Sequence, residues 1–361
     1  MTDRVFNFGA GPAVLPVVVL EQIREHFPSL PGLGMSVLEI SHRSKAFADI
    51  LSVAETNVRE LAELSADYHV LFLQGGATQQ FSMVPMNLLP KQGVADYVIT
   101  GSWAKKAAEE AKKFGLVRVA ATTESENYTR VPGAGELNQS ADAAYMHITS
   151  NNTIYGTQWS SMPNTNGVPL VVDASSDIFS RPFDVTNHGL IYAGAQKNLG
   201  PAGVTLVIMK DGLVGRAPLS LPTLMRYETY VKSRSLHNTP PVFAVYVLSL
   251  VTSWIREQGG LEAMASKNKR KAAKLYAHID GTGFYRGTSH PGSRSDMNVT
   301  FRLPTSDLDA QFVAFAADNG LVGLKGHRSV GGQRASIYNA FPEDGVNALV
   351  DFMVEFERTN G

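Results

Sequence analysis

Short apolar runs separated by segments with helical periodicity dominate this 361-residue chain. The runs end on glycine or polar residues, as strands buried on both faces of a sheet do. They lie at 69–73, 97–100, 117–120, 145–148, 170–173, 190–193 and 204–209. Between runs, apolar residues recur every three or four positions, as Phe47, Leu51, Ala54 and Val58 do, which predicts amphipathic helices. The alternation over 69–209 predicts an α/β fold with a largely parallel sheet and helices on both faces.

The pattern changes after residue 260. A long helix is expected over 242–257, and another begins near Leu261. Strand-like runs then fall at 297–302, 321–324 and 335–338, and helices at 306–319 and 343–357. Residues 222–241, which contain Asn-Thr-Pro-Pro, read as irregular. We therefore expect a large domain over 16–260 and a small α+β domain over 261–361 together with residues 1–15.

Charge and composition exclude several classes of protein. The formal net charge is −1, so no strong field favours nucleic acid or an anionic membrane. The basic run 267–271 lies on a helix with apolar positions and reads as a solvated face. Because the chain has no cysteine, thiolate metal sites, disulfides and cysteine nucleophiles are absent. The N-terminus resembles neither a signal peptide nor a membrane span, so we expect a cytoplasmic protein.

One carboxylate and one amine stand at the ends of two successive apolar runs. The run 170–173 ends on Asp173, and the run 190–193 leads into Lys197. For either residue alone, a structural role is the commoner explanation. Together they match a site for pyridoxal phosphate (PLP). There, a lysine forms the Schiff base and an acid keeps the pyridine nitrogen protonated.

A glycine-rich turn and a tryptophan follow two other runs. The run 69–73 enters Gln74-Gly75-Gly76 and then an apolar helix, and such a junction can bind phosphate through backbone N–H groups and the helix dipole. A Gly-Gly pair alone is more often a tight connection. Trp103 follows the run 97–100 and could either stack on a ligand ring or fill the core.

Two basic clusters are candidate anion sites. His42 and Arg43 precede the amphipathic helix that starts near residue 47, and His327, Arg328 and Arg334 lie in a glycine-rich loop. Guanidinium groups bind carboxylate or phosphate through paired hydrogen bonds. Solvated surface charge is the alternative explanation for both clusters.

The segment 192–203, YAGAQKNLGPAG, resembles the PLP-lysine segment of the phosphoserine aminotransferases, a family of class V (fold type I) aminotransferases. The resemblance covers essentially the whole chain, and segments 41–43 and 326–340 are also specific. It implies a large PLP-binding domain with a mostly parallel seven-stranded sheet flanked by helices, a small α+β domain, and a homodimer with active sites at the subunit interface. It also implies transamination of 3-phosphohydroxypyruvate with L-glutamate, giving O-phospho-L-serine and 2-oxoglutarate in serine biosynthesis. The family also acts on 4-phosphohydroxy-L-threonine in pyridoxine biosynthesis.

The resemblance implies residue roles as well. Lys197 and Asp173 are catalytic, and no metal is expected. The cofactor contacts that it implies are Gly76, Ala77, Thr78, Trp103, Thr153, Asp173, Gln196 and Lys197, with Asn238 and Thr239 binding the phosphate of the partner subunit's cofactor. Some members carry Gly-Arg in place of Ala77-Thr78, so phosphate contact is expected here from backbone amides and the Thr78 hydroxyl. Arg334 is implied for the substrate α-carboxylate, and His42, Arg43, His327 and Arg328 for the distal phosphate or carboxylate.

Three other functions remain open at this point. A cysteine desulfurase-like lyase is disfavoured, because the chain has no cysteine to carry a persulfide. An alanine–glyoxylate or serine–glyoxylate aminotransferase would not need the two basic clusters together. A PLP-binding module without turnover is disfavoured by the intact Asp173 and Lys197.

Overall fold

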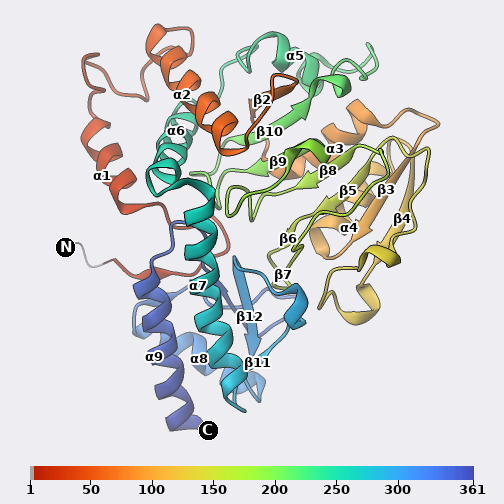
Figure 1. Cartoon of the computed structure of the whole chain (residues 1–361). Coiled ribbons are helices and arrows are strands. Elements are labelled where there is room, and N and C mark those ends of the chain that lie inside the picture. The colour runs from red at the N-terminus through yellow and green to blue at the C-terminus, as the bar shows by residue number, and fades with distance from the viewer. Residues whose placement is uncertain (1–3) are drawn as a thin grey trace.

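A seven-stranded sheet forms the centre of the larger part of the molecule (Figure 1). The structure, a computed structural model, describes residues 4–361. The strand order is β2-β10-β9-β8-β5-β3-β4; β10 is antiparallel to both of its neighbours, and the other four neighbouring pairs are parallel. The strands are β2 (Tyr68–Leu73), β3 (Val94–Ile99), β4 (Leu116–Thr122), β5 (Met146–Thr149), β8 (Leu170–Asp173), β9 (His188–Gly194) and β10 (Thr205–Lys210). The predicted α/β class with a mostly parallel seven-stranded sheet is confirmed.

Helices cover both faces of this sheet and enclose two separate cores. The helices are α1 (Val17–His26), α2 (Lys45–Leu61), α3 (Gly76–Leu88), α4 (Ser102–Ala111), α5 (Tyr227–Lys232) and α6 (Val242–Glu257). Side chains of α2 and α6 pack on one face, and those of α3, α4 and α5 on the other. Successive residues of a strand point to opposite faces, so Val172 lies in the first core and Val171 in the second. The same alternation directs Asp173 towards the face that α3 and α4 cover.

A smaller layer follows the large sheet in the chain and contains a third core (Figure 1). It includes the antiparallel sheet β11-β12-β14 and, next to it, a two-stranded parallel pair between β1 and β13. Phe8, just after β1, lies in the third core. The elements are β1 (Phe6–Asn7), α7 (Gly260–Gly281), β11 (Arg286–Gly287), β12 (Asn298–Arg302), α8 (Ser306–Asp318), β13 (Leu321–Val322), β14 (Gln333–Ser336) and α9 (Glu343–Asn360). The N-terminal strand thus packs with the C-terminal part of the chain.

Helix α7 connects the two parts of the molecule. Its first turns contribute Leu261 and Met264 to the core of the large sheet, and its last turns contribute Leu275 and Ile279 to the third core. Figure 1 shows α7 running from α6 down to the small sheet. The domain division at residue 260 stays a prediction.

The segment 222–241, expected to be irregular, contains the short helix α5. Tyr227 and Tyr230 anchor this helix in the core beneath α3, and Tyr227 Oη donates a 2.6 Å hydrogen bond to Gln80 Oε1. Helix content was missed because α5 has less than two full turns and too few residues to establish a period. Within the part of the chain that the structure describes, no helix combines the length and apolarity needed to cross a membrane.

Candidate active site

Adjacent parallel strands bring the predicted carboxylate and amine together. Asp173 is the last residue of β8, and Lys197 follows the end of β9, which is its parallel neighbour in the sheet. Lys197 Nζ donates a 3.0 Å hydrogen bond to Thr153 Oγ1. Burial lowers the pKa of Lys197 to about 8, Arg334 adds to this effect, and Asp173 opposes it. Roughly one lysine in ten would therefore be neutral at pH 7, and a neutral amine is the nucleophilic form.

The Asp173 carboxylate is buried and held by the residues that follow it. The backbone N–H of Ser175 donates to Asp173 Oδ1 over 3.0 Å, and the Ser175 hydroxyl donates to the same oxygen over 2.6 Å. Burial raises the pKa of Asp173 above its ordinary value, although these two hydrogen bonds act in the opposite direction. Serine two positions after aspartate forms an Asx turn, which aims the carboxylate into the cavity described next.

A cavity of about 320 Å³ collects most of the predicted residues. The predicted residues that line it are Gly76, Ala77, Thr78, Trp103, Thr153, Asp173, Gln196, Lys197, His327 and Arg334. They come from five separate stretches of sequence around the large sheet, from the loop before β14 and from β14 itself. A site made of residues so far apart in sequence requires the whole fold, because no short segment contains it.

The N-terminus of α3 opens onto this cavity without a side-chain cap. Its N-cap Gly75 has φ +88°, and Gly76 has φ +68°, so both adopt the left-handed conformation that glycine tolerates. A side-chain carbon at Gly75 would collide with Gln79. Because no side chain caps them, the first backbone N–H groups of α3 are available to an anion.

Three buried polar atoms around the cavity have no hydrogen-bond partner. They are Trp103 Nε1, Thr149 Oγ1 and Arg334 Nε, and all three residues line the cavity. Leaving such groups unpaired costs about 1–3 kcal/mol each, so they indicate a place that a polar ligand occupies. Lys106 Nζ lies 4.7 Å from the centre of the Trp103 ring.

The loop before β14 brings positive charge to the cavity. Arg334 lies in β14 and is half-buried, and its backbone N–H donates to Leu324 O over 2.7 Å. Partial burial and the neighbouring Arg334 and Arg328 guanidiniums lower the pKa of His327. The N–H of Ser329 donates to His327 Nδ1 over 3.2 Å, so this nitrogen accepts and a neutral His327 carries its proton on Nε2. Both side chains can therefore donate hydrogen bonds to an anion.

Five predicted residues do not line this cavity within one chain. They are His42, Arg43, Arg328, Asn238 and Thr239. His42 and Arg43 precede α2, as predicted, and the Arg43 N–H donates to Ser41 Oγ over 3.2 Å. Thr239 is exposed, and its carbonyl accepts from Gln74 Nε2 over 2.9 Å, just before the glycine turn of α3. Their roles stay predictions.

Other residues of the cavity were not singled out from the sequence. They are Ala10, Gly11, Phe81, Thr149, Asn151, Ile154, Ser175 and Ser176. Ser175 carried a signal, because serine two positions after a strand-terminal aspartate commonly caps its carboxylate. Ala10 and Gly11 come from the N-terminal loop, where the Ala10 carbonyl accepts from Tyr338 Oη over 2.8 Å. That contact spans almost the whole chain, so no local pattern could have indicated it.

A lysine and an aspartate at the ends of neighbouring parallel strands, facing uncapped backbone amides, suit carbonyl and amine chemistry on a phosphorylated cofactor. Residues 5–349 match the family model for class-V aminotransferases. The chain belongs to this family, and it is an aminotransferase.

Several relatives are more specific. The chain is 56% identical over 363 residues to a phosphoserine aminotransferase from Desulfosudis oleivorans, with 100% of both chains covered. The solved phosphoserine aminotransferase of Bacillus circulans subsp. alkalophilus is similar with a TM-score of 0.98, 50% identity and 100% of both chains covered. A PLP-bound phosphoserine aminotransferase from Trichomonas vaginalis is similar with a TM-score of 0.93 at 38% identity, covering 97% of this chain and 100% of that one.

Proposed function

We propose that this aminotransferase interconverts 3-phosphohydroxypyruvate and L-glutamate with O-phospho-L-serine and 2-oxoglutarate, using PLP. One observation carries the proposal. The Lys197–Asp173 pair shares a single cavity with His327 and Arg334, two groups suited to the anionic ends of such substrates. The similarity of the whole chain to phosphoserine aminotransferases supports the same substrate class.

The residues around the cavity fit PLP. When bound, this cofactor supplies an electron sink for the pair of electrons left on the substrate Cα. The uncapped amides of α3 and the Thr78 hydroxyl would hold its phosphate, and Trp103 would lie against its ring. Asp173 would hold the pyridine nitrogen, and Thr153 and Gln196 would hold the substituted edge of the ring. The unpaired Trp103 Nε1 and Thr149 Oγ1 support a polar ligand here.

Lys197 is proposed to move the proton. Its amine donates to Thr153 Oγ1 over 3.0 Å, which fixes the position of Nζ in the cavity that Asp173 also lines. Because the pKa of Lys197 is lowered to about 8, its amine can accept a proton from the substrate Cα and return it near neutral pH. A lysine with the ordinary pKa of about 10.4 would be a poorer base at that pH, because almost none of it would be neutral.

Arg334 and a separate cluster of histidine and arginine side chains would select the substrates. Arg334 is proposed for the α-carboxylate, since a guanidinium pairs with a carboxylate through two parallel hydrogen bonds. His42, Arg43, His327 and Arg328 are proposed for the distal anion, a phosphate in one half-reaction and a γ-carboxylate in the other. One site must accept both, and a cluster of histidine and arginine side chains tolerates either geometry.

The proposed assembly is a homodimer with active sites at the subunit interface. Asn238 and Thr239 lie outside the cavity of their own chain and are proposed to bind the phosphate of the partner's cofactor. The location of His42, Arg43 and Arg328 outside the same cavity supports a site completed by a second copy. Sedimentation of the purified holoenzyme tests the dimer, and a monomer with full activity would contradict it.

Amino-donor profiling tests the function. Purified protein is incubated with 2-oxoglutarate and either O-phospho-L-serine, L-serine, L-alanine or 4-phosphohydroxy-L-threonine, and glutamate formation is measured. We expect phosphoserine to exceed serine and alanine by orders of magnitude in kcat/KM. Preference for alanine or serine would indicate a glyoxylate-type aminotransferase instead. A visible absorbance band lost on borohydride reduction, without turnover of any donor, would indicate a PLP-binding module.

A further inference from the structure

Two arginines face each other across the small sheet and have no anionic partner. Arg286 of β11 and Arg302 of β12 are directly opposite in an antiparallel ladder. Like charges at such positions repel one another and destabilise the strand pair. Among residues 4–361, no carboxylate forms an ion pair with either guanidinium. The pair therefore carries an electrostatic cost that nothing in the described chain offsets.

Both arginines line a cavity of about 420 Å³ that is separate from the cavity of Lys197. Asn127, Thr129 and Thr288 add an amide and two hydroxyls to its wall, and no acidic residue lines it. The Thr129 hydroxyl already donates to Glu126 O over 3.0 Å and the Thr288 hydroxyl bonds to Thr300 Oγ1 over 2.6 Å. The two guanidiniums and the Asn127 amide therefore remain as donors for an anion. Tetrahedral phosphate oxygens suit donors arranged in this way.

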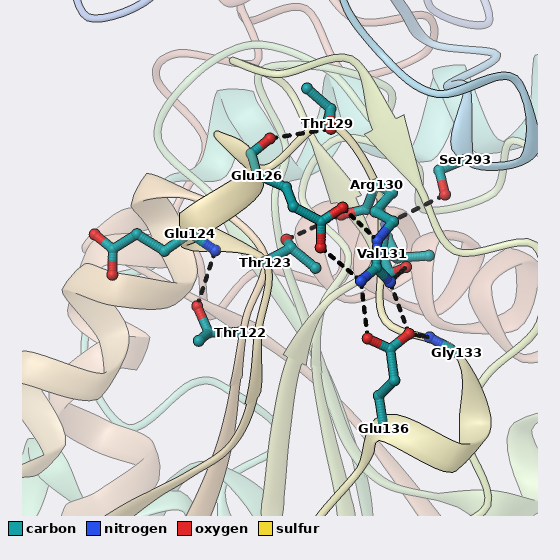
Figure 2. Close-up of polar contacts among 10 residues, drawn as sticks. All are labelled: Thr122, Thr123, Glu124, Glu126, Thr129, Arg130, Val131, Gly133, Glu136 and Ser293. Atoms are coloured by element: carbon teal, nitrogen blue, oxygen red, sulfur yellow. Dashed lines mark hydrogen bonds and ion pairs between the residues drawn. The ribbon is translucent and has the colours of Figure 1, made fainter.

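The carboxylates closest in sequence to the cavity wall are already engaged. Figure 2 shows Arg130 between Glu126 and Glu136, on the same segment as Thr129. Arg130 donates to Glu126 over 2.6 and 2.7 Å and to Glu136 over 2.7 and 2.9 Å. This pairing lowers the pKa of Glu136 to about 2 and also lowers the pKa of Glu126. Neither glutamate is free to turn towards the two arginines.

Two further acidic groups beside this region are also paired with cations. Glu124 accepts from Lys105 Nζ over 2.6 Å. On the side of the small sheet, Asp280 accepts two hydrogen bonds from Arg294, over 2.6 and 2.7 Å. Asp309 accepts instead from the backbone N–H of Leu303, the residue after Arg302, over 2.9 Å. No ion pair links any of these carboxylates to Arg286 or Arg302, so the positive charge there is a local excess.

The loop that carries His327 separates this cavity from the active site. Val330 lines the cavity of Arg286 and Arg302, whereas His327 lines the catalytic cavity of Lys197. A side-chain carbon at Gly331 would lie 3.6 Å from Arg302 Nη2, so the guanidinium rests against the backbone of the loop. An anion held by Arg302 would thus lie against the outer side of the substrate loop.

We propose that Arg286 and Arg302 bind the phosphate group of a small phosphate monoester at a site distinct from the catalytic cavity. Free phosphate shares this chemistry. The cavity volume of about 420 Å³ leaves room for an organic group beside the phosphate. The bound anion offsets the repulsion across β11 and β12 and holds the loop from outside.

Equilibrium dialysis of the PLP-loaded enzyme tests the site, with radiolabelled glycerol 3-phosphate as one probe and inorganic phosphate as the other. We expect two bound glycerol 3-phosphate molecules per subunit in the wild type, one in each cavity. In the double variant Arg286→Gln/Arg302→Gln, the affinity for the molecule in the cavity of these two arginines falls at least roughly tenfold, because charge-assisted hydrogen bonds are lost. Arg43→Gln, at a residue proposed for the distal phosphate of the substrate, keeps the molecule at Arg286 and Arg302 and weakens binding of the molecule in the catalytic cavity. Tighter binding of glycerol 3-phosphate than of inorganic phosphate supports a monoester as the ligand, and equal or weaker binding overturns that assignment.

The matched control is Arg24→Gln/Arg216→Gln, which removes the same charge from two exposed arginines that line neither cavity. Arg286→Gln alone, an exposed change, guards against misfolding of the double variant and is expected to weaken the site severalfold. If the proposed aminotransferase substrate is wrong and the catalytic cavity binds no phosphate ester, the wild type binds one molecule per subunit. Arg286→Gln/Arg302→Gln still loses that molecule. Binding of the same strength in the wild type, the double variant and the control overturns the proposal.

Discussion

A buried lysine in α7 supports the turn that follows β14. Lys271 is 2% exposed, and its Nζ donates to the carbonyls of Ile337, Tyr338 and Phe341 over 2.8, 2.7 and 3.2 Å. No carboxylate of the described residues pairs with it, and burial lowers its pKa well below the ordinary value. Three carbonyl acceptors match the three N–H donors of an ammonium group, and this match opposes the effect of burial.

Lys271→Met removes these donors and keeps most of the side-chain volume. In this variant the Tyr338 carbonyl still accepts a hydrogen bond from the backbone N–H of Phe341 over 2.9 Å. The carbonyls of Ile337 and Phe341 lose the donor that Lys271 supplies. Each unsatisfied carbonyl costs about 1–3 kcal/mol. The methionine variant no longer pays the free energy of burying an ammonium group, and this offsets part of the cost of the two unsatisfied carbonyls. We therefore expect the free energy of unfolding to fall by about 2–4 kcal/mol.

Urea unfolding of the cofactor-free protein, followed by circular dichroism, measures the change. Lys274→Met is the matched control, because Lys274 is exposed on the same helix and its ammonium group donates to the Asn347 side chain rather than to buried carbonyls. We expect the control to change stability by less than about 0.5 kcal/mol. If both variants are as stable as the wild type, the three carbonyls do not depend on the ammonium group, and the argument for Lys271 fails.

Three further predictions concern the active site and its support. Because its pKa falls from 10.5 to about 8 on folding, Lys197 binds fewer protons in the folded cofactor-free protein between these values. Wild-type stability should therefore rise from pH 8 to 10.5 relative to Lys197→Met, by up to about 3 kcal/mol in paired urea titrations; a flat difference would refute the shift. Arg334→Ala should raise the Michaelis constant for phosphoserine at least tenfold and leave PLP affinity within about twofold, as spectroscopic titration would show; an unchanged Michaelis constant contradicts its role. Asn339→Ala should lower the free energy of unfolding by about 2 kcal/mol, because its amide donates to Phe179 O and accepts from Asn268; thermal unfolding at the wild-type midpoint would contradict this.

The sequence indicated the large sheet well for a physical reason. Strands such as β8 and β9 are buried on both faces, so they read as unbroken apolar runs, and the residues at their ends stand out. Asp173 and Lys197 were found in this way. Helix α5 was missed because it is short and its two anchoring tyrosines establish no period.

The assembly of the site was harder to predict. Arg334 of the small sheet and Lys197 beyond β9 line one cavity, and no local pattern encodes the tertiary arrangement that brings them together. His42 and Asn238 lie outside the cavity of their own chain, so a single sequence cannot say which copy of the site they serve. The unpaired Arg286 and Arg302 are visible only once β11 and β12 are paired.

Helix α7 is embedded in two cores, with Leu261 and Met264 in one and Leu275 and Ile279 in the other. Helix formation is cooperative, and packing supplies most of the stability of a helix in a protein. Melting of either core therefore also weakens α7 where it packs in the other core. The two halves of the chain should consequently exchange their slowest amide protons at similar rates. Expression of the chain from residue 260 onwards without the preceding part would expose Leu261 and Met264 of α7 and invite aggregation.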